Sequence, residues 1–157
     1  MPGLLQNHIA VITGAGSGIG RAIALGYARE GATVATLDIN GEPAAETAKA
    51  IRDAGSKAQA FTLDVSDRAA CRTVAAEVAK QLGKVSILVN NAGITRRNPF
   101  TADADTVAAD WEAVIATNLD GVFNVTQAFT APLRASKGRI INIGSIASFM
   151  ANPFGIA

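Results

Sequence analysis

The sequence has few of the residues and segments that mark secreted and membrane proteins. Its one cysteine, Cys71, cannot form an internal disulfide, and its alanine-rich surroundings predict a small helix residue rather than a reactive thiol. No apolar run approaches the roughly 20 residues of a membrane-spanning helix. The N-terminus lacks the basic start and apolar run of a signal peptide. These absences predict a cytoplasmic protein with no membrane partner.

An excess of charge of one sign is also missing. The 157 residues carry 14 Lys and Arg against 13 Asp and Glu, which leaves a formal net charge of +1. This balance gives no reason to expect nucleic acid as a partner, and we expect no metal site. A chain of this length can bury roughly 70% of its unfolded surface. We therefore expect residues 1–157 to form one globular domain, without repeats or linkers.

What the sequence does contain is an alternation of short apolar runs and longer amphipathic ones. The predicted strands cover residues 9–13, 33–38, 58–65, 85–90 and 138–145. The predicted helices cover 18–30, 42–55, 66–83 with Ser66 as the cap, and 106–136 with a bend near 120–121. Apolar strands that each lead into a helix predict an α/β fold: a doubly wound, Rossmann-like parallel sheet. Five strands are expected, one short of two βαβαβ halves.

A glycine-rich turn, Thr13-Gly14-Ala15-Gly16-Ser17-Gly18-Ile19-Gly20, joins the first strand to the first helix. Glycines allow a tight turn and a close approach of a pyrophosphate to the helix N-terminus. The strict G-x-G-x-x-G spacing fails, because Ile19 stands at its last position. A plain turn is the alternative, but the strand-turn-helix context favours a dinucleotide site. No lysine follows the glycines, which disfavours a nucleotide triphosphatase.

Asp38 ends the second predicted strand. A carboxylate at this point can accept hydrogen bonds from an adenosine ribose and repels a 2′-phosphate. Ser17 adds no charge in the glycine turn, and no Lys or Arg follows in Ile39-Asn40 to offset the repulsion. The sequence therefore favours NAD over NADP, although Asp38 alone is also consistent with a solvated acid at a strand end.

These motifs resemble the short-chain dehydrogenase/reductase family over essentially the whole chain. The resemblance rests on TGAGSGIG at 13–20, Asp64-Val65, NNAG at 90–93, Asn118 and Ser145. It implies that the cofactor is bound by Gly14, Ser17, Gly18, Ile19, Gly20, Asp38, Asp64, Val65 and Asn91. Asp64 would bond the adenine amino group, with the Val65 backbone adding to the adenine site, and Asn90 would stabilise the sheet.

The same resemblance implies that Ser145 and Asn118 are catalytic. Ser145 would hydrogen-bond the reacting carbonyl or alcohol oxygen, and Asn118 would hold a water in a proton relay. Taken alone, Ser145 is equally an ordinary strand-end serine and Asn118 a helix-break residue. We interpret Tyr27 and Trp111 as packing residues, and Arg96-Arg97 as a solvated loop pair.

The family moves its proton with a tyrosine placed four residues before a lysine, which is general acid–base catalysis. That tyrosine normally lies roughly thirteen residues beyond the serine, which from Ser145 is the position after Ala157. We therefore expect an N-terminal portion of an NAD-dependent oxidoreductase that interconverts an alcohol and a ketone or aldehyde, inactive alone. The parent enzyme would be a dimer or tetramer. The alternatives are a non-catalytic dinucleotide-binding or regulatory module, and a self-associating fragment.

Overall fold

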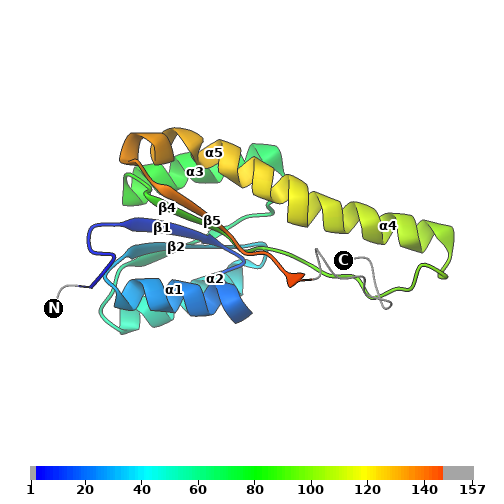
Figure 1. The fold of residues 1–157 in the computed structure, drawn as a ribbon. Helices are drawn as coiled ribbons and strands as arrows, with labels where there is room; N and C mark the ends of the chain where they lie inside the picture. Colours follow the sequence, from blue (N-terminus) through cyan, green and yellow to red (C-terminus); the bar gives the residue numbers. More distant parts are fainter. Residues whose placement is uncertain (1–2, 147–157) are drawn as a thin grey trace.

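A five-stranded parallel sheet forms the centre of the computed structural model, which describes residues 3–146 (Figure 1). The strands are β1 (Ile9–Thr13), β2 (Thr33–Asp38), β3 (Ala58–Thr62), β4 (Ile87–Asn90) and β5 (Arg139–Asn142). Their order in the sheet is β3-β2-β1-β4-β5, with every neighbouring pair parallel. The chain therefore runs outward from β1 in one direction and then returns to β1's other side, which makes the β1–β4 boundary the topological switch point.

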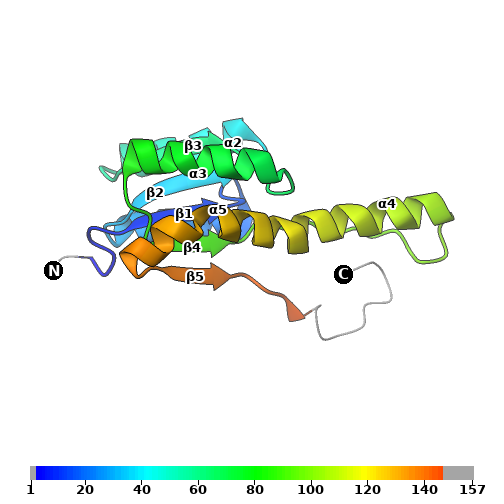
Figure 2. The ribbon, with the colours of Figure 1, turned by 90° about the horizontal axis from the view of Figure 1, so that it is seen from above.

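Helices cover both faces of the sheet, as a doubly wound fold requires (Figures 1 and 2). The helices are α1 (Gly18–Arg29), α2 (Gly41–Asp53), α3 (Arg68–Leu82), α4 (Ala104–Ile115) and α5 (Gly121–Ser136). Helices α1 and α2 pack on one face, and α3 and α5 pack on the other. None of the helices within residues 3–146 has the length and hydrophobicity to cross a membrane. The predicted fold class and its five strands are confirmed.

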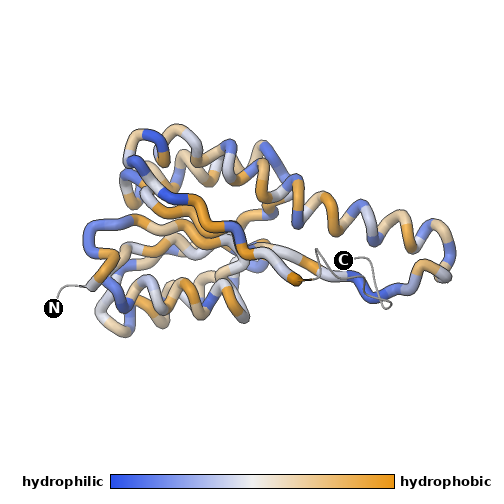
Figure 3. The backbone as a smooth tube through the Cα atoms, in the orientation of Figure 1, coloured by the Kyte–Doolittle hydropathy of each residue, from blue (hydrophilic) through white to orange (hydrophobic). Residues whose placement is uncertain are grey.

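Two apolar cores follow from the alternation of side chains along the strands. On β1, Val11 faces the core under α3 and α5, whereas Ala10 and Ile12 face the core under α1 and α2. All three side chains are fully buried. Apolar residues gather along the central strands (Figure 3). Tyr27 is half-buried against the second core, which confirms its predicted packing role.

Two strands, β3 and β5, end earlier than predicted, because each stops where its neighbour stops. Thr62 is the last residue of β3, since its partner Asp38 ends β2; the prediction extended this strand to residue 65. Likewise β5 ends at Asn142, opposite Asn90 at the end of β4. Residues 63–65 and 143–145 are thereby released to form loops at the carboxyl edge of the sheet.

The bend predicted near residues 120–121 is a π-helical turn, Ala116–Asp120, that joins α4 to α5 without a break. Helix α4 projects beyond the sheet (Figure 2). Trp111, predicted to be a packing residue, lies on this helix and is 53% exposed, so it is not part of the core. The Arg96 side chain is not simply solvated either, because its Nε lies 3.4 Å from Asp110 Oδ1.

The cap of α3 also differs from its prediction. Asp67, not Ser66, is the N-cap, and its Oδ1 accepts hydrogen bonds from Ala69 N at 2.8 Å and Ala70 N at 2.9 Å. The Ser66 hydroxyl donates instead to Asp64 Oδ1 at 2.7 Å. A carboxylate that accepts two amides of the first turn satisfies donors that would otherwise lack partners.

We expect Asp67→Ala to lower the free energy of unfolding by about 1 kcal/mol, because α3 loses its cap. Asp67→Asn is the matched control, since asparagine caps helices as well as aspartate does, and it should keep most of the stability. Urea unfolding followed by circular dichroism measures both. An Asp67→Ala variant as stable as the parent would contradict this assignment of the cap.

Candidate functional site

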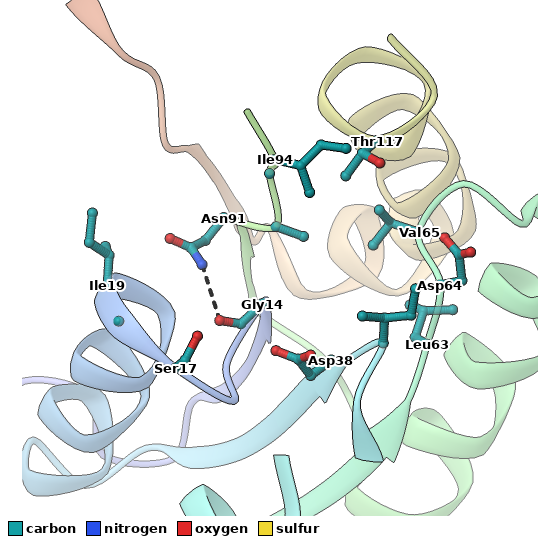
Figure 4. A pocket seen from close by; sticks show the side chains of 14 residues that line it. Gly14, Ser17, Ile19, Asp38, Leu63, Asp64, Val65, Asn91, Ile94 and Thr117 are labelled. Atoms are coloured by element: carbon teal, nitrogen blue, oxygen red, sulfur yellow. Dashed lines mark hydrogen bonds between the residues drawn. The ribbon is translucent and has the colours of Figure 1, made fainter. Parts of the chain in front are cut away.

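A cavity of about 520 Å³ opens at the carboxyl edge of the sheet, beside the switch point (Figure 4). Ligands of open α/β sheets bind at this place. The wall of the cavity is formed by Gly14, Ser17, Gly18, Ile19, Asp38, Ile39, Leu63, Asp64, Val65, Asn91, Ala92, Gly93, Ile94 and Thr117. The cavity thus brings together all but one of the predicted cofactor-binding residues, from four different strand ends.

The exception is Gly20, which lies beneath the glycine turn rather than in the cavity wall. A Cβ on Gly20 would overlap the carbonyl oxygen of Gly14, so only glycine allows α1 to approach β1 this closely. Gly14 has a φ of 64°, in the left-handed region that favours glycine. Gly20 therefore acts on the site through the geometry of the turn.

The N-terminus of α1 points its amides at the cavity. Ser17 is the N-cap residue, and its side chain makes no capping hydrogen bond. The first amides of a helix have no partner within the helix, and together with the helix dipole they favour an anion. The turn and helix therefore fit a pyrophosphate, which is the group that the glycine motif predicts.

Asp38 ties the end of β2 to the glycine turn. Its Oδ2 accepts a hydrogen bond from Gly16 N at 2.9 Å, and its Oδ1 accepts one from Asn40 N at 3.0 Å. Both carboxylate oxygens are thus oriented by backbone amides before any ligand arrives. A side chain on Gly16 would meet Asp38 Oδ2 at 2.9 Å, so glycine at this position keeps the carboxylate close to the turn.

The charged side chains of the cavity wall are two carboxylates, Asp38 and Asp64, and no Lys or Arg is among the described residues that line it. Asp64 Oδ1 accepts hydrogen bonds from Ser66 N at 2.9 Å and from Ser66 Oγ at 2.7 Å. Asp64 and Asp38 lie on strand-end segments of neighbouring strands and both border the open space (Figure 4). The cavity is therefore suited to groups that donate hydrogen bonds rather than to an additional phosphate.

Asn91 and Thr13 join the ends of the two central strands. Asn91 Nδ2 donates to the carbonyl oxygen of Thr13 at 2.9 Å. It also donates to that of Gly14 at 3.3 Å (Figure 4). The Thr13 hydroxyl in turn accepts the backbone amides of Asn91 and Ala92, both at 3.0 Å. Thr13 is a structural residue that our sequence reasoning did not single out, although a buried polar residue in an apolar strand requires hydrogen-bond partners.

The two residues predicted to be catalytic are outside the cavity wall. Asn118 lies in the π-helical turn, where its Oδ1 accepts Ile94 N at 2.8 Å and its Nδ2 donates to Ile94 O at 2.9 Å. Its neighbour Thr117 lines the cavity instead. Ser145 is exposed and follows β5 at the same edge of the sheet. π-helical turns often occur at functional sites.

Cys71 is fully buried in α3, as predicted for an unreactive residue. Burial, and after it the nearby carboxylates of Asp67 and Asp64, raise the pKa of its thiol to about 11. The thiolate is therefore scarce at neutral pH. Within residues 3–146, no three His, Cys, Asp or Glu side chains come together as a metal site.

Comparison with known proteins identifies the family. The model of the short chain dehydrogenase family matches residues 8–157. The chain is 40% identical over 151 residues to the 3-oxoacyl-(acyl-carrier-protein) reductase FabG of Thermotoga maritima, covering 95% of this chain and 60% of that protein. It is 45% identical over 145 residues to nodulation protein G of Azospirillum brasilense, covering 90% of this chain and 57% of that protein.

A crystal structure of a gluconate 5-dehydrogenase from Burkholderia cenocepacia, in complex with NADP and tartrate, is also similar. It has a TM-score of 0.86 and 43% identity, over 96% of this chain and 58% of that one. The chain therefore belongs to the short-chain dehydrogenase family, whose members are oxidoreductases that bind nicotinamide dinucleotides. It spans 57–60% of the length of these three relatives.

The close approach at Gly20 can be tested with two identical substitutions on one helix. Gly20→Ala should lower the free energy of unfolding by about 1–3 kcal/mol, because its methyl group overlaps the backbone of the turn. Gly26→Ala is the matched control: nothing lies within 4 Å of its Cβ position, so alanine should stabilise α1 by up to about 1 kcal/mol. Equal effects of the two substitutions in urea unfolding would contradict the packing described for Gly20.

Proposed function

We propose that this chain is the NAD-binding portion of an oxidoreductase that interconverts an alcohol and a ketone or aldehyde. The observation that carries the choice of NAD is the Asp38 carboxylate, held by two backbone amides in a cavity whose described wall contains no Lys or Arg. NADP is the less favoured cofactor, because its 2′-phosphate would meet this negative charge. The NADP in the Burkholderia structure is a property of that protein.

The dinucleotide would be held by residues from the ends of β1, β2, β3 and β4. The first amides of α1, with Gly14, Ser17, Gly18 and Ile19 around them, would bind the pyrophosphate. Asp38 would accept hydrogen bonds from the adenosine ribose, and Asp64 one from the adenine amino group. Val65 would complete the adenine site through its backbone, while Asn91 would lie toward the nicotinamide. When bound, the cofactor supplies hydride transfer at its nicotinamide ring.

We further propose that Ser145 orients the reacting oxygen of a small alcohol or carbonyl substrate. Asn118 would hold the relay water, while its side-chain amide also bonds the backbone of Ile94 at both ends. The only tyrosine, Tyr27, packs against the core beneath α1 and is not placed for proton transfer. The proton-transfer pair would therefore come from outside these residues, and the chain alone should bind NAD without turnover.

Two further proposals concern the whole protein. We propose that it assembles as a dimer or tetramer through α5, whose Phe123 is 52% exposed. Its cytoplasmic location stays a prediction from the sequence.

The preference for NAD should depend on the charge of Asp38. We expect the parent chain to bind NAD at least about tenfold more tightly than NADP in isothermal titration calorimetry. Asp38→Asn should bring the two affinities close together, because it removes the charge while leaving an oxygen that accepts the Gly16 amide.

Asp38→Ala serves as the comparison for that experiment, because it removes both the charge and the link to the turn. It should weaken the binding of NAD as well as the discrimination. Equal affinity of the parent chain for NAD and NADP would overturn the proposed cofactor preference.

A further inference from the structure

The wall of the cavity near Asp64 is a loop without regular secondary structure. Residues 63–67 connect β3 to α3, and Leu63, Asp64 and Val65 line the cavity. A loop that discriminates between ligands has to keep its polar groups in fixed positions, since a mobile site can rearrange around the wrong ligand. What holds this loop in place is therefore part of how the site recognises its ligand.

One buried side chain of α5 holds this loop in place. Asn124 is 3% exposed, and its Nδ2 donates to the carbonyl oxygens of Val65 and Ser66, both at 3.2 Å. Its Oδ1 accepts a hydrogen bond from Arg68 Nε at 3.0 Å. The nitrogen and the oxygen of the Asn124 amide thus both have hydrogen-bond partners, as a buried amide requires.

Two neighbouring contacts extend this connection. The Arg68 guanidinium lies over the Phe123 ring, 5.4 Å from its centroid. Gly121, at the start of α5, packs so closely on Val65 that a Cβ there would come within 2.6 Å of Val65 Cγ2. Helix α5 therefore fixes both the backbone of residues 65–66 and the first residue of α3.

We propose that Asn124 is a positioning residue for recognition of the adenine base; this rests on the dinucleotide-binding function proposed above. The carbonyls of Val65 and Ser66 are held by Asn124, which fixes the backbone of the loop next to Asp64. The charged group of the loop is the Asp64 carboxylate, which is oriented by Ser66. A carboxylate accepts a hydrogen bond from the adenine amino group and repels the carbonyl oxygen that hypoxanthine carries at the same position.

The test compares NAD with nicotinamide hypoxanthine dinucleotide, using the full chain and calorimetry. The parent should bind NAD at least about tenfold more tightly than the hypoxanthine analogue. Asn124→Leu removes both donors at similar volume, so the loop loses the hydrogen bonds that hold it. The ratio of the affinity for NAD to that for the hypoxanthine analogue should then fall to about threefold or less. Binding of nicotinamide mononucleotide, which lacks the adenine half, should stay unchanged in the variant.

A second variant and a control separate positioning from general stability. Asn124→Asp keeps an acceptor for Arg68 but loses the donors to Val65 and Ser66, so it should lower the ratio as Asn124→Leu does. Thr130→Val, at an exposed site further along α5, should leave the ratio at the parent's value. Hydrogen exchange at the amides of residues 65–67 should quicken in both Asn124 variants without ligand.

The outcomes are distinct. A parent chain that binds no NAD overturns the proposed function and this inference with it. A parent chain that binds NAD, with the same ratio in both Asn124 variants, overturns the inference and leaves the proposed function standing. A loss of affinity for nicotinamide mononucleotide equal to the loss for NAD would also overturn it, because Asn124 would then support the whole fold rather than the adenine end.

Discussion

The close contact between the backbone of Gly14 and the first turn of α1 at Gly20 is the constraint on which the rest of the site depends. It brings the start of α1 against the end of β1, with no room for a side chain between them. The helix amides then face the cavity, and the turn passes close enough to β2 for Gly16 to reach Asp38. A backbone contact thus sets the positions of both the α1 N-terminus and the Asp38 carboxylate in the cavity wall.

Polar links between strand ends extend this constraint across the sheet. Thr13 and Asn91 join β1 to β4, and Asn90 Nδ2 donates to Asn142 Oδ1 at 2.8 Å, which joins β4 to β5. Asn90 is buried, and it also bonds Thr126 on α5. The predicted role of Asn90 in stabilising the sheet agrees with these contacts. Amide side chains at the carboxyl edge therefore hold the strands in register where the loops of the site begin.

The central strands were predictable because their sequence determines their limits. Strands β1 and β2 are buried along most of their length and mainly apolar, and the structure gives both the predicted bounds. The ends of β3 and β5 were not predictable in this way, because they depend on where Asp38 and Asn90 end the neighbouring strands. The N-cap of α3 was not predictable for a similar reason. Ser66 and Asp67 are both residue types that cap helices well, and only the loop geometry decides between them.

For the site, local motifs predicted most of the cavity wall. A glycine turn after a strand and polar residues at strand ends show in the sequence itself where they lie in the fold. The contacts of Asn118 with Ile94 and of Asn124 with Val65 were beyond sequence reasoning. Each joins residues far apart in the chain, and an asparagine inside a helix gives no signal of which distant carbonyl it will meet. Sequence motifs thus identify the surface of this site better than the residues behind it.

The hydrogen bond from Asn91 to Thr13 spans 78 positions of the chain, and this separation has a consequence for how the protein folds. Closing a long loop costs more entropy than closing a short one, so we expect β1 to pair with β4 after the neighbouring β1–α1–β2 unit has formed. The cavity does not exist until that pairing is made. A ligand that binds in the cavity therefore binds only molecules in which β1 and β4 have paired. Its binding stabilises the folded state as a whole.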